Sequence, residues 1–590
     1  MAFQLSPGVV TTEIDLTTVI PRVSTTAGGF VGDFGWGPAN TVVTVDSENT
    51  LVSLFGKPDA NSFIPFFTAA SFLSYGNNLK LVRAVNSGTK NATSAGNGVL
   101  IENDDSWFNT YRANSATNSG SYANNFAIGA AAKYAGTLGN TLKVAFCPAG
   151  NSEVFASWAY KSYFDSAPGT SQYATSRGAS NDEIHIVVVD ALGQIATGGT
   201  PAGTNAAGSV LETFKALSVA SDARNFDGST NFYPDVIASQ SKYVRWLAHP
   251  SNATNWGVAA TSNATPGGVI TYSGISGFGA NFANGNTLTG GTYTVATDAN
   301  KQTAWDKLRN ADEVDISLAV TGDASATLAQ FVIDNVAEYR KDCIAFISPT
   351  SANVVNNPGS EVSAITTQKQ TNINRSTSYA VFDSGWKYMF DKYNNVYRWI
   401  PLNGDIAGLC VTTDTVADPW YSPAGLNRGQ LKNVVKLSFN PNKTARDDLY
   451  KIGVNPVVSL PGQGTVLFGD KTMLAKPSAF DRINVRRLFI VLEKAISAAS
   501  RYSLFEFNDE FTRSQFIALV EPFLRDVKGR RGIYDYRVVC DTTNNTPEVI
   551  DRNEFVGDIY IKPARSINFI QLNFVAVRTG VAFDEIAGRF

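Results

Sequence analysis

Both ends of this 590-residue chain read as single β-strands, and this feature constrains the fold more than any other. Residues 9–16 follow the turn Ser6-Pro7-Gly8, and residues 567–578 alternate apolar and polar side chains near the other end. Neither segment has a hairpin partner close by in the sequence, and an unpaired strand leaves a row of backbone donors and acceptors open to another chain. We therefore expect both ends to pair with other copies of the chain, which favours a polymer subunit.

The composition is that of a folded, nearly neutral protein, and a chain of 590 residues is expected to form about two to four domains. A net charge of −3 without a long Lys/Arg run argues against a nucleic-acid partner and against an anionic surface partner. No apolar stretch approaches the length of a membrane span, and no basic leader precedes an apolar run. We therefore expect no transmembrane segment, no secretory signal, and folding in a cytoplasm.

The sequence offers little material for catalysis or for cofactor binding. Residues 464–472 (GTVLFGDKT) come closest to a phosphate-binding loop, but Asp470 stands where that loop needs its Lys, and we expect a strand that leads into a turn. The two histidines are too few for a zinc site or a catalytic triad, and the alternation around His185 predicts a half-exposed strand position. We therefore expect no enzyme activity, no cofactor and no metal. The cysteines are far apart and form no CxxC pair, so we expect buried thiols at Cys147, Cys343, Cys410 and Cys540.

The local amino-acid composition predicts compact ends and a middle that is rich in Ala, Ser, Thr, Asn and Gly and poor in charged residues. We expect an α+β, multidomain fold in which both ends build a shared mixed α/β core, β-rich outer domains are inserted into it, and strand arms extend from both termini. The expected divisions are an N-terminal arm at 1–20, a core-proximal domain formed by 21–89 and 341–450, an outer inserted domain at 90–195, a second inserted domain at 196–340, a C-terminal core domain at 451–566 and a C-terminal arm at 567–590.

Two amphipathic helices are predicted near the C-terminal end, one after Asp481 and one after Asn508 and Asp509, whose side chains can cap its first turn. The second helix should kink at Pro522 and end at Gly529. We expect these helices to pack on one face of a mixed sheet. The region is also locally basic, and ion pairing within an assembly is favoured over a nucleic-acid channel because stacking aromatics and a larger basic excess are missing.

Several motifs at both ends resemble those of the tail sheath proteins of contractile-tailed bacteriophages. LPGQGTVLFGDKTML at 460–474, INVRRL at 483–488 and Phe505-Glu-Phe-Asn508 are similar to the family's C-terminal motifs. Ser6-Pro-Gly-Val9 with Glu13 is similar to its opening arm, and FGWGP at 34–38 resembles the phage members in particular. The resemblance is confined to the two ends of the chain, because the middle matches only in composition and placement.

The resemblance implies a structural subunit without catalytic residues that forms stacked hexameric rings around an inner tail tube. It implies baseplate and tail-terminator proteins as further partners, assembly in the host cytoplasm, and a final place in the virion. It also implies contraction without nucleotide that drives the tube through the host envelope for genome ejection, with no direct nucleic-acid contact and with membrane contact only through the contracting tail. A surface-layer or carbohydrate-binding adhesin is the alternative, suggested by the Asn-, Ser-, Thr- and Gly-rich middle.

The resemblance also implies which residues make contacts between subunits. In the family both arms add strands to sheets of neighbouring subunits, and flexible linkers around 17–23 and 562–566 would hinge during contraction. The expected arm-strand residues are Val9, Val10, Glu13, Ile14, Leu16, Phe569, Ile570, Leu572, Phe574, Val575 and Val577.

The resemblance does not identify the residues that face the inner tube. From the locally basic C-terminal helical region we expect these to be Arg513, Arg525, Lys528, Arg530 and Arg531.

Overall fold

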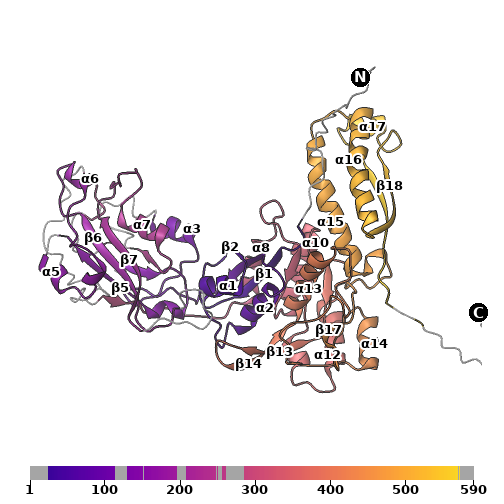
Figure 1. Ribbon diagram of the computed structural model, residues 1–590, viewed down its shortest axis with the longest axis horizontal. Helices are drawn as coiled ribbons and strands as arrows, with labels where there is room; N and C mark the ends of the chain where they lie inside the picture. The colour runs from indigo at the N-terminus through magenta and orange to yellow at the C-terminus, as the bar shows by residue number, and fades with distance from the viewer. Residues whose placement is uncertain are drawn as a thin grey trace, which may run out of the picture.

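The computed structural model describes residues 24–112, 129–149, 152–195, 207–247, 249, 256–260, 285–568 and 571. The described chain is elongated, with an outer lobe at one end, a body in the middle and a long helical pair with a β-hairpin at the other end (Figure 1). The mixed α/β architecture expected from the sequence is present, distributed over several sheets. The strands expected at 9–16 and along the C-terminal arm lie outside the described residues.

The body is built on a six-stranded sheet in the order β12-β11-β10-β1-β3-β2. Five strands are parallel, and β2 joins β3 antiparallel at one edge. The parallel strands are buried along their length, as is typical of a sheet that is covered on both faces. The bounds are β1 Gly28–Asp33, β2 Val42–Val45, β3 Leu79–Ala84, β10 Leu318–Val320, β11 Ile344–Ile347 and β12 Ala380–Phe382.

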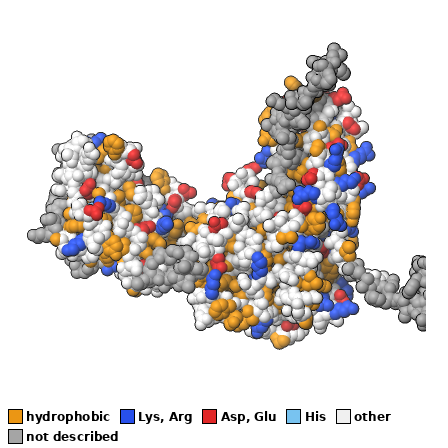
Figure 2. All heavy atoms as spheres, in the orientation of Figure 1, with side chains coloured by type: hydrophobic (Ala, Val, Ile, Leu, Met, Phe, Trp, Pro, Cys, Tyr) orange, Lys and Arg blue, Asp and Glu red, His pale blue; other side chains and the backbone are white. Residues whose placement is uncertain are grey.

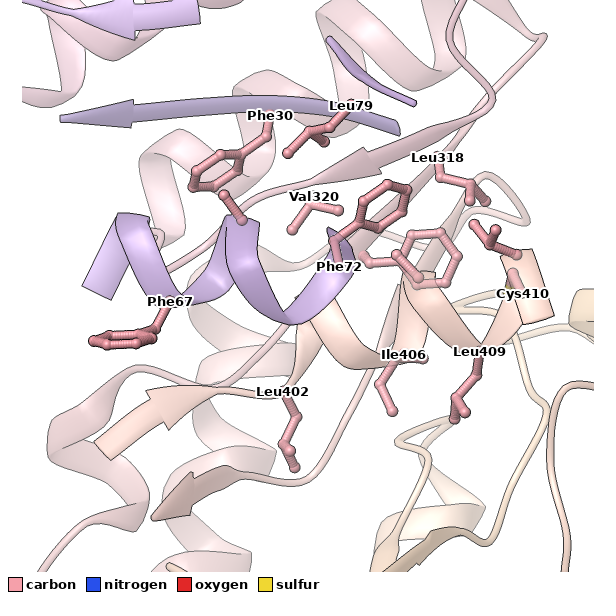
Figure 3. Packing of buried hydrophobic residues seen from close by; sticks show 14 of the residues in the cluster. Phe30, Phe67, Phe72, Leu79, Leu318, Val320, Leu402, Ile406, Leu409 and Cys410 are labelled. Atoms are coloured by element: carbon pink, nitrogen blue, oxygen red, sulfur yellow. The ribbon is translucent and has the colours of Figure 1, made fainter. Parts of the chain in front are cut away.

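Helices pack on both faces of this sheet. On one face, α2 (Phe63–Leu73) and α13 (Asn403–Val416) form a core with Phe30, Leu318 and Val320 of the strands (Figure 3). On the other face, α8 (Asp298–Asp306) and the helical run α9 (Ala326–Phe331), η6 (Val332–Ala337) and α10 (Glu338–Arg340) cover the alternate strand residues. The two-sided cover follows from parallel strands, since each crossover places a helix on one face or the other.

The outer lobe is one inserted unit, although two inserted domains were expected. A single core cluster extends from Ala92 to Leu288, across the expected division at 195/196. Its antiparallel sheet has the order β7-β6-β5-β9, and β4 pairs with β8 beside it. The bounds are α3 Asp104–Ser106, β4 Ala130–Ala132, β5 Leu142–Pro148, α5 Ser152–Ser157, α6 Gln172–Thr175, β6 Glu183–Asp190, β7 Ser209–Ser218, α7 Tyr233–Gln240, β8 Val244–Trp246 and β9 Asn286–Thr287.

The boundary expected at residue 340 is also wrong, because α8 and β10 belong to the body and the insertion has returned by residue 294. The two chain segments that connect the body to the outer lobe lie side by side. Asn86 Nδ2 donates to the Val295 carbonyl at 3.2 Å, and Thr89 Oγ1 donates to the Thr294 carbonyl at 3.1 Å. The misplacement has a simple cause, since β10 is only three residues long and leaves no strand pattern in the sequence.

Smaller elements extend the body below the main sheet. The strands β13, β14 and β15 form an antiparallel sheet, and β16 and β17 form a hairpin. Residues 464–467 therefore belong to a β-hairpin, as expected, and not to a phosphate-binding loop. The bounds are α1 Glu48–Phe55, α11 Ser351–Val354, α12 Glu361–Thr367, β13 Trp386–Asp391, β14 Val396–Pro401, β15 Lys436–Leu437, α14 Lys443–Lys451, β16 Val457–Leu460 and β17 Gly464–Leu467.

The C-terminal part contains the two predicted helices, α15 (Ile483–Ser500) and α16 (Glu510–Gly529). Asp509 caps α16 by accepting the backbone N–H of Thr512 at 2.8 Å, and the helix continues through Pro522. A hairpin of β18 (Ile533–Val539) and β19 (Asp558–Pro563), joined by a segment that holds α17 (Pro547–Asp551), packs on α16 around Val520 and Leu524. The four cysteines are buried free thiols, as predicted.

Candidate functional site: the roots of the two terminal arms

The described chain leaves the body toward the C-terminal arm through a polar cluster, which we call the C-root cluster: Tyr450, Asp470 and Arg482 with Ser566 and Asn568. Asp470 is 3% exposed, and its Oδ2 accepts from Ser566 Oγ at 2.7 Å. Asn568 Nδ2 donates to the Tyr450 hydroxyl at 2.7 Å and to Asp470 Oδ1 at 3.3 Å. Two side chains of the outgoing segment are thus held by one buried carboxylate and its neighbour.

Residues of the body complete this cluster. Arg482 Nη1 pairs with Asp470 Oδ1 at 3.2 Å and also donates to the Tyr450 hydroxyl. Ser422 Oγ donates to the same Asp470 oxygen as Ser566, at 2.9 Å. Burial is the largest of the influences that raise the pKa of Tyr450, so its hydroxyl remains protonated near neutral pH. The aspartate that rules out a phosphate-binding loop therefore anchors the segment from which the C-terminal arm extends.

The chain enters the body from the N-terminal arm at a second polar cluster, the N-root cluster: Thr25, Asp414 and Arg487. Thr25 Oγ1 donates to Asp414 Oδ2 at 2.6 Å. Arg487 Nη2 reaches both oxygens of the same carboxylate, at 2.7 and 2.6 Å. The side chains of Arg487 and Asp414 are only 3% and 6% exposed, so this is a buried ion pair that joins α13 to α15. Such a pair fixes geometry more than it adds stability.

Both roots border grooves that Trp420 lines. A groove of about 990 Å³ between α15 and α16 includes residues 24–26, and a second groove of about 1070 Å³ includes residues 564–568. Trp420 itself is buried in the cluster formed by these helices and the hairpin, and its Nε1 donates to the Arg530 carbonyl at 3.1 Å. Both arms therefore start where the body meets the C-terminal helices, with Trp420 next to each root.

The hairpin of β18 and β19 offers edges to which a further strand could add. It is a two-stranded sheet, and among the described residues neither strand has a second partner. One face packs on α16, where Tyr536, Val538 and Ile559 are partly buried. A bulge at residues 533–535 strengthens the local twist of β18. Backbone groups along both edges are available for pairing with an extended segment.

The predicted tube-facing residues do not form one exposed surface. Arg513 is buried and donates to Asn508 Oδ1 at 3.3 Å, so its expected exposure is wrong. Its place on the buried stripe of α16, next to Thr512, explains the burial. Lys528 pairs with Asp535 at 3.0 Å, and Arg530 pairs with Asp418 and, at 3.7 Å, with Asp526. The remaining two, Arg525 and Arg531, are exposed.

Two other expectations can be checked against the described residues. His185 is buried and not half-exposed: its ring stacks on Phe164 at 4.4 Å between centroids, and Nδ1 accepts the Ala216 N–H at 3.0 Å. Within the described residues, no group of His, Cys, Asp and Glu is arranged to hold a metal ion, and no helix there is long and apolar enough to cross a membrane. The arm-strand residues of both termini lie outside the described part of the chain.

The sequence reasoning did not identify the root clusters. Asp414, Asp470 and Arg482 were not expected to have a role, and Arg487 was seen only as part of a basic region. A signal existed: Arg486 and Arg487 fall within the first turns of an amphipathic helix among apolar residues, and both are buried. A charged side chain at such a position needs a partner, because an unpaired buried charge is very costly.

In this fold, buried polar groups hold the two chain segments that lead to the arms. A family model of the phage tail sheath protein central domain matches residues 286–473, and one of the phage tail sheath C-terminal domain matches residues 475–576. The tail sheath protein of Vibrio phage KVP40 is 36% identical over 99% of this chain and 100% of the relative. The tail sheath protein of Enterobacteria phage T4 is 34% identical over 99% of each chain.

The chain therefore belongs to the family of phage tail sheath proteins, which are structural components of contractile phage tails and not enzymes. The predicted resemblance is confirmed, and the adhesin or surface-layer alternative is set aside. A crystal structure of a sheath tail protein from Listeria innocua is similar with a TM-score of 0.50 and 11% identity, over 92% of this chain and 96% of that one. This likeness shows a shared fold.

Proposed function

We propose that this chain polymerises as stacked hexameric rings around the inner tail tube of a phage and contracts, without nucleotide, to drive that tube through the host envelope for genome ejection. Membership in the tail sheath family supports this function. Its partners would be further copies of itself, the tube protein, and baseplate and tail-terminator proteins. Assembly would take place in the host cytoplasm, the finished sheath would be part of the virion, and any effect on a membrane would come through the contracting tail.

One observation carries the proposal: both arm roots lie where the body meets the C-terminal helices, next to the unit that presents the open-edged hairpin. We propose that the N- and C-terminal arms of one subunit add strands to the hairpins of neighbouring subunits. Such an arrangement uses Val9, Ile14 and Leu16 of one arm and Ile570, Leu572 and Phe574 of the other. Because donor and acceptor are different surfaces, the exchange is head-to-tail and propagates along a helix.

The energetics favour a mesh over single pairings. An added strand makes about five backbone hydrogen bonds, each worth roughly 0.5–1.5 kcal/mol net, and burial of its apolar face adds a few kcal/mol more. Association costs about 4–15 kcal/mol, so one arm alone is marginal. Each subunit would donate two arms to its neighbours and accept two arms from them. Each pairing then raises the effective concentration for the next one, which makes the assembled tube stable although each link is weak.

Contraction would keep the arm strands paired while the bodies rotate and slide into a second packing. The anchored roots divide each arm into a fixed part and a linker, so the hinge on the C-terminal side would lie beyond Asn568 unless the C-root cluster opens. An extended sheath of this kind is kinetically trapped and needs a trigger from the baseplate.

Deletion of residues 1–16 tests the proposal. The shortened chain should remain soluble and folded, because the N-root cluster and the described body lie beyond the deleted residues. It should form no tubes in electron micrographs under conditions in which the full chain does. Normal tubes from the shortened chain would refute the arm exchange, whereas an aggregated chain would refute the independence of the body.

A further inference from the structure

The connection between α15 and α16 carries an exposed apolar surface, which we call the aromatic tip: Tyr502, Leu504, Phe505, Phe507 and Phe511. Their exposed fractions are 81%, 62%, 105%, 84% and 75%. Aromatic side chains of this kind bury about 150–250 Å² each when covered, so the tip presents several hundred Å² of apolar surface. Exposed patches of this size on soluble proteins mark sites of interaction.

The backbone of the tip is held in an unfavourable conformation. Phe505 has a φ of 72°, in the left-handed region that bulky residues rarely adopt. Such strain costs about 1–3 kcal/mol and is concentrated at functional sites. The Phe505 ring itself lies fully in solvent.

The aromatic tip is acidic. Residues 504–511 (LFEFNDEF) contain Glu506, Asp509 and Glu510 and no Lys or Arg. Asp509 is committed to capping α16, whereas Glu506 and Glu510 are exposed beside the aromatic rings. A partner surface must therefore combine apolar area with positive charge.

A surface with these properties lies at the other end of α16, and we call it the basic groove. It has a volume of about 1070 Å³ and includes Phe468 and Tyr534, which are 50% and 66% exposed. Figure 2 shows Lys and Arg side chains gathered over the part of the molecule formed by α16 and β18. Among the described residues that line the groove, the acids are Asp447 and Asp470, and Asp470 is paired with Arg482. Its cations are Arg428, Lys443, Arg446, Lys528, Arg531 and Arg565.

The tip and the groove of one molecule cannot meet. The tip precedes Glu510 at the start of α16, and the groove includes Lys528 and Arg531 at its end. A helix of 20 residues rises about 30 Å. A contact between the two surfaces is therefore intermolecular, and it joins two different patches, as in an open head-to-tail polymer.

We propose that the aromatic tip of one subunit docks into the basic groove of a second copy of the chain. Phe505 and Phe507 cover the rings of Phe468 and Tyr534, and Glu506 and Glu510 face Arg446 and Arg531. The exposed area of the tip approaches the roughly 800 Å² per partner of a standard interface. The inference rests on the proposed polymer and adds a contact to it that is independent of the arms.

Cysteine crosslinking tests this contact directly. Phe507→Cys is made in one preparation and Tyr534→Cys in another, and the two are mixed under oxidising conditions. The native thiols give little background, because Cys147, Cys343, Cys410 and Cys540 are at most 2% exposed. A disulfide-linked pair should form only in the mixture. Phe226→Cys, on the outer lobe and at 104% even more exposed than Phe507, replaces Phe507→Cys as the control. Equal crosslinking with the control would overturn the proposal.

The same crosslink separates this contact from the arm exchange. Both cysteine variants are also made in the chain that lacks residues 1–16. Persistence of the crosslink in the shortened chains, with or without tubes, supports the docking of the tip. Loss of the crosslink with loss of the arm would show that the contact only follows from arm exchange, which would overturn its independence.

Substitutions give a second measurement. Phe505→Ala with Phe507→Ala should leave the melting temperature unchanged, because both rings are in solvent. The variant should raise the critical concentration for tube assembly by about 100-fold, or about tenfold per ring. Phe226→Ala should leave this critical concentration unchanged.

Charge reversal tests the same contact. Glu506→Lys with Glu510→Lys should block assembly, and addition of chains that carry Arg446→Glu and Arg531→Glu should restore mixed polymers. Normal assembly of the double alanine variant would overturn the proposal. Shielding of the tip side chains from solvent only when the inner tube protein is present would also overturn it.

Discussion

The C-root cluster is expected to determine whether the C-terminal arm leaves the body in a fixed direction. Ser566→Ala combined with Asn568→Ala removes the two side chains by which the outgoing segment is held. Ser566 donates to a buried, charged carboxylate at 2.7 Å, and Asn568 donates to the Tyr450 hydroxyl at 2.7 Å. Hydrogen bonds to a charged partner contribute about 1.5–3 kcal/mol and neutral ones about 0.5–1.5 kcal/mol. The segment should therefore lose about 2–4 kcal/mol of local stability.

Amide hydrogen exchange in the unassembled subunit measures this loss. A change of about 2–4 kcal/mol corresponds to roughly 30- to 1000-fold faster exchange of the amides at 564–571. Ser422→Ala is the matched control, since Ser422 donates to the same Asp470 oxygen at 2.9 Å but belongs to the body. It should leave exchange at 564–571 nearly unchanged. Unaltered exchange in the double variant would refute the anchoring role of the cluster.

Three further predictions concern the body. Arg487→Met leaves Asp414 buried without its partner and should lower the free energy of unfolding by about 3–5 kcal/mol, measured as a lower urea midpoint. Arg525→Met, at an exposed position, should change the free energy of unfolding by less than about 0.5 kcal/mol. Burial raises the pKa of Asp383 to about 8 from 3.8, so the folded state holds the proton more tightly than the unfolded state. The free energy of unfolding should therefore fall, by up to ~1.4 kcal/mol per pH unit, as pH rises from about 4 to about 8. Thermal melts of Asp383→Asn should depend less steeply on pH, and an unchanged slope would contradict this assignment. Replacement of residues 89–294 by a short Gly-Ser linker should leave a folded body with one cooperative melt by circular dichroism, because the remaining ends are neighbours joined by the hydrogen bond from Asn86 to the Val295 carbonyl. Aggregation of this variant would contradict the prediction.

The helical elements near the C-terminal end were predictable because their signals are local. The apolar periodicity of α15 and α16 and the capping aspartate at 509 are each set by neighbours within a few residues. Short parallel strands carry no such signal: β10 has three residues, and its place in the sheet depends on β1 and β11, which are distant in sequence. The boundary of the insertion was misplaced for that reason.

The candidate site was predictable only in outline. The alternation of the terminal segments and the family motifs pointed to the arms, but the groups that anchor them come together only in the folded chain. Asp470 was noticed because it breaks a phosphate-binding pattern, and its contacts with Ser566 and Arg482 join residues 96 and 12 positions away. His185 was placed half-exposed from alternation alone, whereas packing against Phe164 buries it.

The central claim is that both termini complete β-structure in neighbouring copies. A cryo-electron microscopy map of the assembled tube, at a resolution that traces the backbone, tests it most directly. The account predicts that residues 9–16 and 569–577 of each subunit are hydrogen-bonded along the β18–β19 hairpins of adjacent subunits. It would be contradicted by a map in which both segments pair only within their own chain.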